Sequence, residues 1–324
     1  GAPGVAGSGV AGGSGSKGGS GPAGSGPAGA PGQGGSPGYG GGTAGGAAAG
    51  RGGGTVVGMG GTAGTASGGR GGGTGVGGSG GGLPLFSFFV TSLQGMQDLS
   101  GSPDGFGGDL RYGETGDGAG LRGADKICAA LAEKSMPGAS AKQWRAFLST
   151  VAGPVNARDR IGNGPWYDRM GRKVGTSLDD LVDNTTTGSN SGRPAMADAS
   201  IRDDLPNEYG VPNHTDGKPG CTGNNCPDNH DVLTGTGPKG LLYMSNMSYT
   251  CNDWTYKENV SGMNPWCGHS WPRQGSGTNW MSALREGGCA PGVNLTETGG
   301  PMPGVYTVGT GGGYGGIYCF ALVP

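Results

Sequence analysis

Three histidines and seven cysteines are the residues with the most distinctive chemistry in this chain. The histidines, His214, His230 and His269, each stand beside Asn, Asp or Ser in segments that read as loops. No two of them have the helical spacing that brings the ligands of a zinc protease to one face. The sequence therefore predicts no zinc site, and it favours a packing or hydrogen-bonding role for His230.

Oxygen-rich loops are a second candidate for metal chemistry. They carry carboxylate and amide side chains at Asp216, Asn224, Asp228 and Asp231. Calcium prefers such oxygen ligands, but the same residue types also form ordinary Asx turns. Both interpretations stay open, and calcium is the one cofactor that the sequence admits.

Constellations typical of catalysis are missing from the sequence. It contains no nucleophile spaced for activation by a base, no carboxylate pair in a helical or strand frame, and no usable phosphate loop. Its many Gly-x-Gly patterns carry no information in a chain with 82 glycines. We therefore expect a protein that is not an enzyme.

The elements that position these residues must lie in the second part of the chain. Only 32% of the 324 residues are hydrophobic, and all six Trp and all six Phe follow Gly82. A core forms only where large apolar side chains are available. We expect an assembly segment at residues 1–82 and one folded domain with long loops at residues 83–324.

Charge is divided at the same boundary. Lys17, Arg51 and Arg70 are the only charged residues before Gly82, and the whole chain has a formal net charge of −2. Neither part has the clustered basic face of a nucleic-acid-binding protein. We expect no nucleic-acid partner.

The cysteines indicate the compartment. All seven lie between Cys128 and Cys319, in a domain rich in Gly, Asn and Thr. A loop-rich domain of this kind needs cross-links, and these form in oxidising compartments. We expect a secreted protein, extracellular or at the cell surface. No apolar run is long enough for a membrane span and no leader is recognisable, so the sequence reads as a processed chain.

Glycine recurs every third residue in three stretches of the first segment. These glycines are Gly9, Gly12, Gly15, Gly18, Gly21 and Gly24, then Gly26, Gly29, Gly32, Gly35, Gly38 and Gly41, then Gly69, Gly72, Gly75, Gly78 and Gly81. Composition alone is typical of a flexible linker, whereas the period matches polyglycine II or polyproline II helices, which have about three residues per turn. We expect such helices, packed at least partly between subunits, because inter-helix hydrogen bonds would offset the entropy lost on ordering.

Two local patterns predict the first elements of the folded domain. Residues 83–91 are rich in aromatic and β-branched side chains and predict the first strand. In residues 120–133, Ile127 and Leu131 share one helical face with Cys128 beside them. This pattern predicts a core-facing helix that carries a cysteine.

A series of short motifs then runs in order through the domain. Its members are Gly120-Leu121-Arg122-Gly123-Ala124-Asp125 with Cys128, Trp144-Arg145-Ala146-Phe147-Leu148-Ser149-Thr150, Gly164-Pro165-Trp166, His230-Asp231-Val232-Leu233-Thr234-Gly235, Cys251-Asn252-Asp253-Trp254, Gly288-Cys289 and Ile317-Tyr318-Cys319-Phe320. This series resembles endostatin and the bacterial surface proteins called endostatin-like, over most of residues 86–322. The resemblance implies an α+β domain with the C-type lectin-like (endostatin-like) fold and long loops.

The resemblance also implies cross-links. One disulfide would join Cys128 to Cys319, and a second would join Cys251 to Cys289. Cys221 and Cys226 stand close enough in the sequence to close their own turn. Cys267 is then left over, either as a free buried thiol, which we expect, or as half of an intermolecular bridge.

Ligands of the family are less well matched. Endostatin binds zinc through an N-terminal His-rich stretch that this sequence lacks. It binds heparin through surface arginines, and Arg145, Arg158 and Arg160 stand in the corresponding stretch. Because Asp159 and Asp168 are close to them, we expect solvated surface charge there.

These observations lead to three functional hypotheses. We expect a structural subunit of an extracellular fibre or surface filament, which associates with other copies of itself through residues 1–82 while the domain decorates or locks it. The alternative is a surface adhesin that binds glycan or matrix through the domain, with the first segment as a stalk. A third hypothesis is ice binding by a polyglycine bundle that presents rows of Thr and Ser.

Overall fold

The computed structural model describes residues 84–183, 185, 192–222, 226–272, 279–296 and 303–323. All of these residues belong to one unit that spans Gly75–Pro324. The repeated glycines between Gly9 and Gly81, on which the predicted assembly depends, lie outside the described residues, as does the calcium candidate Asn224.

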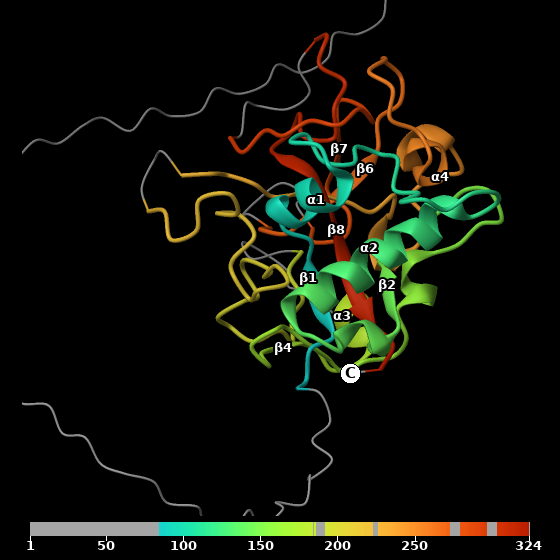
Figure 1. Ribbon diagram of the computed structural model, residues 1–324. Helices are drawn as coiled ribbons and strands as arrows, with labels where there is room; N and C mark the ends of the chain where they lie inside the picture. Colours follow the sequence, from blue (N-terminus) through green and yellow to red (C-terminus); the bar gives the residue numbers. More distant parts are fainter. Residues whose placement is uncertain are drawn as a thin grey trace, which may run out of the picture. The chain divides into compact units, whose positions relative to one another are not determined.

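Six strands form the main sheet, in the order β1-β8-β5-β6-β7, and β2 also pairs with β8 (Figure 1). These strands are β1 (Phe88–Val90), β2 (Trp144–Ala146), β5 (Asp231–Leu233), β6 (Trp266–His269), β7 (Leu284–Arg285) and β8 (Gly313–Ala321). A separate two-stranded sheet contains β3 (Trp166–Tyr167) and β4 (Lys173–Gly175). β8 runs antiparallel to β1 and β2 and parallel to β5.

The helices are few and mostly short. They are α1 (Leu93–Ser100), α2 (Ala119–Ser135), α3 (Leu178–Val182) and α4 (Cys251–Trp254), with 3₁₀ turns at Ala139–Lys142, Ala157–Arg160, Pro238–Gly240 and Met247–Thr250. Sheets combined with separate helices agree with the predicted α+β class. In the described part of the chain, no helix has the length and apolar character needed to cross a membrane.

The two predicted elements are present. α2 covers the predicted helix and buries Ile127, Cys128 and Leu131, so that prediction is confirmed. The predicted first strand is shorter than expected, because β1 contains only Phe88–Val90. Its flanking residues still pair with β8, since Ala321 N–H donates to Ser87 O and Thr91 N–H donates to Ile317 O, each at 2.9 Å.

β8 divides the interior into two cores, because successive side chains of a strand point to opposite faces. Ile317 and Cys319 belong to a first core together with Ile127 and Leu131 of α2. On the other face, Tyr318 and Phe320 belong to a second core, whose large side chains also include Phe88, Phe147, Trp166 and Trp280. The main sheet is therefore buried on both sides of its central strand.

Three disulfides join Cys128 to Cys319, Cys221 to Cys226, and Cys251 to Cys289. They are the pairs that the resemblance and the short spacing implied. The first ties α2 to β8, and Cys267 in β6 is buried and free. Disulfides persist in oxidising environments, so these bonds fit an extracellular or secreted protein.

α4 is an unusual turn that the disulfide of Cys251 anchors. All four of its residues have positive φ, from 46° at Cys251 to 65° at Trp254. Left-handed helical backbone costs about 1–2 kcal/mol for each residue other than glycine. The carboxylate of Asp253 helps to offset this cost by accepting hydrogen bonds from Val151 N–H and Ala152 N–H at 2.7 and 2.8 Å.

Candidate functional site

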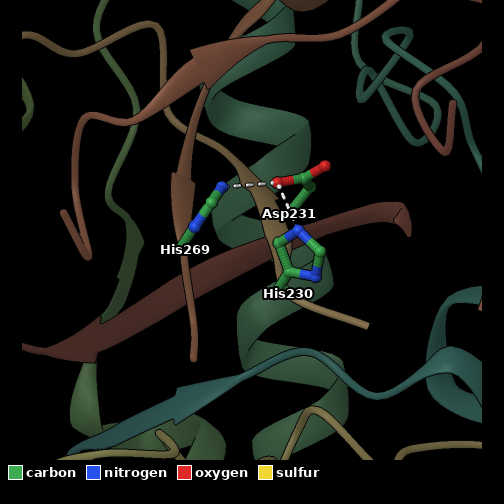
Figure 2. Close-up of side chains that lie close together, drawn as sticks. All are labelled: His230, Asp231 and His269. Carbon is green, nitrogen blue, oxygen red and sulfur yellow. Dashed lines mark ion pairs between the residues drawn. The ribbon is translucent and has the colours of Figure 1, made fainter. Parts of the chain in front are cut away.

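Two histidines and an aspartate meet inside the main sheet (Figure 2). His230 directly precedes β5, Asp231 begins that strand, and His269 ends β6. The antiparallel register of β5 and β6 places Asp231 opposite His269 as a cross-strand pair. Of the described residues, only these three form a group of His, Cys, Asp or Glu whose ligand atoms lie within 4.8 Å of one another.

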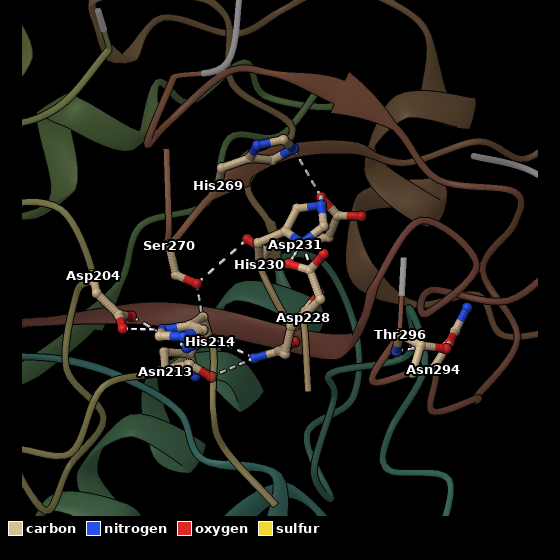
Figure 3. Close-up of polar contacts among 11 residues, drawn as sticks. Asp204, Asn213, His214, Asp228, His230, Asp231, His269, Ser270, Asn294 and Thr296 are labelled. Carbon is tan, nitrogen blue, oxygen red and sulfur yellow. Dashed lines mark hydrogen bonds and ion pairs between the residues drawn. The ribbon is translucent and has the colours of Figure 1, made fainter. Parts of the chain in front are cut away.

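Both histidines approach the same carboxylate oxygen. Asp231 Oδ1 lies 3.0 Å from His269 Nε2 and 3.7 Å from His230 Nε2. The other ring nitrogen of His230, Nδ1, donates to the carbonyl oxygen of Asp228 at 2.8 Å (Figure 3). In a neutral ring this bond fixes the proton on Nδ1, so Nε2 offers its lone pair toward Asp231.

Glu286, which follows β7, lies beside this group but is not one of its three members. Its Oε2 accepts a hydrogen bond from Gly311 N–H at 2.8 Å. A Cβ placed on Gly311 would lie 2.3 Å from Asp231 Oδ2 and 3.2 Å from Glu286 Oε1, so both carboxyl groups face this glycine. We refer to His230, Asp231, His269 and Glu286 as the β5–β6 cluster.

The cluster is buried, and burial governs its protonation. None of its four residues is more than 3% exposed. Burial and the neighbouring Asp231 raise the pKa of Glu286 well above its usual range. Burial also opposes ionisation of Asp231, but His269 and His230 bring its pKa below the ordinary value. Asp231 is therefore the ionised carboxylate of the pair.

Several polar atoms of the cluster have no hydrogen-bond partner. Within the described segments, no hydrogen bond of good geometry reaches either carboxylate oxygen of Asp231, either ring nitrogen of His269, or Oε1 of Glu286, although His269 and Glu286 lie close enough to Asp231 to lower its pKa as hydrogen-bond donors. The 3.0 Å contact between His269 and Asp231 is an ion-pair distance without hydrogen-bond alignment. Since buried polar atoms in folded proteins are nearly always partnered, this cluster calls for an additional group.

The remaining metal candidates lie in different surroundings. The Asp216 carboxylate accepts hydrogen bonds from Leu93 N–H at 2.9 Å and from Tyr314 Oη at 3.0 Å. His214 pairs with Asp204 (Figure 3) and stacks on Trp271 with ring centroids 4.6 Å apart. Of the three calcium candidates that the structure describes, Asp231 belongs to the β5–β6 cluster and Asp228 adjoins it.

The three arginines that were expected to carry solvated surface charge form ion pairs with aspartates in the structure. Arg160 has a side chain only 10% exposed, and it binds Asp125 with an N–O distance of 2.8 Å. Arg145 also approaches Asp125, at 3.7 Å, while Arg158 pairs with Asp183 at 3.3 Å. The expectation of solvated charge is therefore wrong for Arg160, because Asp125 of α2 neutralises it in the interior.

A surface pocket offers a second kind of site. It has a volume of about 420 Å³ and shares no lining residue with the β5–β6 cluster. Its lining includes the half-buried aromatic pair Phe106 and Tyr112, whose rings meet edge to face with centroids 5.7 Å apart. Asp109 and Arg111 form a bidentate ion pair at its edge. Aromatic faces beside polar side chains are suited to small polar ligands.

Comparisons with protein-family models, with curated proteins and with solved structures give no match.

Sequence reasoning did not find the β5–β6 cluster as a unit. It named His230, His269 and Asp231 separately, and it did not single out Glu286. The signal was the doublet His230-Asp231 at the start of an apolar strand and Cys267-x-His269 in another. Only the strand register brings the two segments together, and single-strand patterns do not specify register between distant strands.

Proposed function

We propose that this chain is a structural subunit of an extracellular fibre or surface filament. In this proposal the glycine-rich segment of residues 1–82 associates with the same segment of other copies. The domain of residues 83–324 decorates or locks the assembly, and we propose for it the endostatin-like version of the C-type lectin-like fold.

The observation that carries this proposal is the closed interior of the domain. Both cores are built from described residues of the domain, and the disulfide between Cys128 and Cys319 joins α2 to β8, the last strand. A domain with its own core and cross-links does not require residues 1–82 for folding. Those residues are therefore available for self-association through backbone hydrogen bonds.

We also propose that the domain has no catalytic activity. The β5–β6 cluster is the group of side chains most suited to acid-base chemistry, but His230, Asp231 and His269 are all buried. A catalytic base must come within hydrogen-bond reach of its substrate, so burial favours a structural role for the cluster.

Assembly of the full chain tests the proposal. Gly32→Leu or Gly75→Leu places a side chain on the face where neighbouring backbones would approach, so either change should reduce fibres seen by negative-stain electron microscopy. Gln33→Leu and Thr74→Leu add the same side chain one residue away from that face and should leave assembly intact. Equal assembly by all four variants, or no fibres from the unmodified chain, would contradict the proposal.

A second candidate function is glycan binding by the surface pocket. Phe106 and Tyr112 provide an aromatic pair beside the charged side chains of Asp109 and Arg111. Binding to an array of immobilised glycans should be lost in Tyr112→Ala and kept in Tyr209→Ala, which removes a tyrosine that is 43% exposed elsewhere. Absence of any bound glycan on the array would remove this candidate.

A further inference from the structure

We propose that His230, Asp231 and His269 bind one divalent transition-metal ion of the zinc class, with Glu286 beside the site. This inference is independent of the assembly proposal, because it concerns only the interior of the domain. Bound by these three residues, the ion would link β5 to β6.

Two of the spacings between the acceptor atoms are close to those of a tetrahedral site. Zinc binds histidine nitrogen and carboxylate oxygen at about 2.0–2.1 Å, which makes neighbouring ligand atoms of a tetrahedron about 3.3 Å apart. Asp231 Oδ1 lies 3.0 Å from His269 Nε2 and 3.7 Å from His230 Nε2, on either side of that value. Small shifts of side chains would therefore suffice to form the site.

Charge also favours a cation at this position. Two carboxyl groups and two imidazoles are buried together, and among the described residues no Lys or Arg forms an ion pair with Asp231 or Glu286. Burial of an ionised carboxylate is costly, and within the described residues His230 and His269 form the ion pairs that offset this cost for Asp231. A divalent ion would add positive charge and would use the unpartnered atoms of Asp231 and His269.

Surrounding hydrogen bonds orient the proposed ligands and the neighbouring Glu286. His230 Nδ1 bonds to the Asp228 carbonyl oxygen, which directs Nε2 toward Asp231. Glu286 Oε2 is held by Gly311 N–H, while Oε1 is left for another partner. Metal-binding residues in proteins characteristically have such second contacts, which fix the tautomer and the ring orientation.

Two glycines before β8 let the backbone come very close to the cluster. A Cβ on Gly311 would lie 2.3 Å from Asp231 Oδ2, and one on Gly312 would lie 2.8 Å from His230 Cε1. Neither side chain would fit without displacing a proposed ligand. The segment before β8 therefore approaches the cluster so closely because it consists of glycine.

The ligand types distinguish zinc from calcium. Calcium takes about 6–8 oxygen ligands, whereas this cluster presents two imidazole nitrogens and two carboxylates. Two imidazoles and one carboxylate form a ligand set of the kind that zinc takes. Cys267 is two residues before His269, but its Sγ lies 3.8 Å from Pro265 O, and the metal-ligand group does not include it.

Zinc titration of the purified full chain tests the proposal. The chain is first treated with a chelator, and zinc binding is measured by competition with a chromophoric chelator. We expect one zinc ion per chain, with affinity reduced at least about 10–100-fold in His269→Asn and Asp231→Asn. His214→Asn removes a histidine outside the cluster and should bind zinc like the unmodified chain.

X-ray absorption of the zinc-loaded unmodified chain provides a readout that does not depend on the folding of a variant. We expect nitrogen and oxygen neighbours at about 2.0–2.1 Å and no sulfur at about 2.3 Å. Failure to bind one zinc ion, a sulfur neighbour, or equal loss of affinity in His214→Asn and His269→Asn would overturn the proposal.

Discussion

At the residue scale, several carboxyl groups are buried in the described part of the domain, and Glu208 is one of them. Glu208 accepts hydrogen bonds from both the backbone N–H and the hydroxyl of Ser92, the residue that caps α1. Burial, with a smaller contribution from Asp216, raises the pKa of Glu208 to about 7, although the hydrogen bonds from Ser92 act in the opposite direction. The hydrogen bonds at the start of α1 therefore involve a carboxyl group that titrates near neutral pH.

The raised pKa predicts how stability changes with pH. The folded domain holds the proton of Glu208 up to a pKa of about 7, whereas the unfolded chain releases it near the ordinary value of 4.5. The stabilising contribution is complete below the unfolded pKa and is lost as pH rises through the folded pKa. A difference of this size corresponds to about 3 kcal/mol.

Glu208→Gln keeps the shape of the side chain but removes the titration. Its free energy of unfolding, measured with urea between pH 4.5 and 7.5, should therefore fall less with rising pH than that of the unmodified chain. Glu258→Gln, which alters an exposed glutamate, should leave the pH dependence unchanged. The same pH dependence in all three proteins would contradict the assignment.

At the element scale, two glycines of α2 let neighbouring segments of the chain pack directly against the backbone of the helix. A Cβ on Gly120 would lie 2.2 Å from the carbonyl oxygen of Asp253, and one on Gly123 would lie 2.1 Å from that of Leu110. The left-handed turn of α4 and the chain before α2 thus pack directly on the helix backbone. Gly120 and Gly123 belong to the motif that carries the resemblance to endostatin, and this close packing gives a physical reason for both.

Gly120→Ala tests this packing. In a solvent-exposed helix the change would stabilise by about 1 kcal/mol, but here the added methyl group would push the α4 turn away. We expect a net loss of about 1–3 kcal/mol in the free energy of unfolding. Gly237→Ala is a suitable control, because its Cβ would make only ordinary contacts at 3.4 Å or more. Stabilisation by Gly120→Ala would show that α4 does not press on the helix.

The disulfides should differ in their contribution to stability. The bond between Cys128 and Cys319 closes a separation of 191 residues, and the bond between Cys221 and Cys226 closes one of 5. Chain entropy alone predicts stabilisation of about 5 and about 2 kcal/mol, respectively. Thermal unfolding of the two double Cys→Ala variants should show the larger loss for the first pair, and the reverse order would contradict its role as the main tie.

For the whole molecule, the sequence predicted those features that depend on local pattern or composition. The core helix with Ile127 and Leu131 was predictable because its periodicity is contained in one segment. The central place of β8 was not predictable from local pattern, since Gly313–Ala321 is partly glycine and gains its position from pairing with β1, β2 and β5. The β5–β6 cluster was missed for the same reason, because it depends on register between strands far apart in the sequence.

At the scale of the whole molecule, we expect the domain of residues 83–324 to fold without the glycine-rich segment. Thermal unfolding of the full chain and of residues 83–324, each with its disulfides intact and at equal dilution, tests it most directly. We predict unfolding midpoints that agree within about 2 °C, since a change of 1 kcal/mol would shift the midpoint of a domain of this size by about 2–4 °C. A fragment that is unfolded, or that melts well below the full chain, would contradict the two-part organisation.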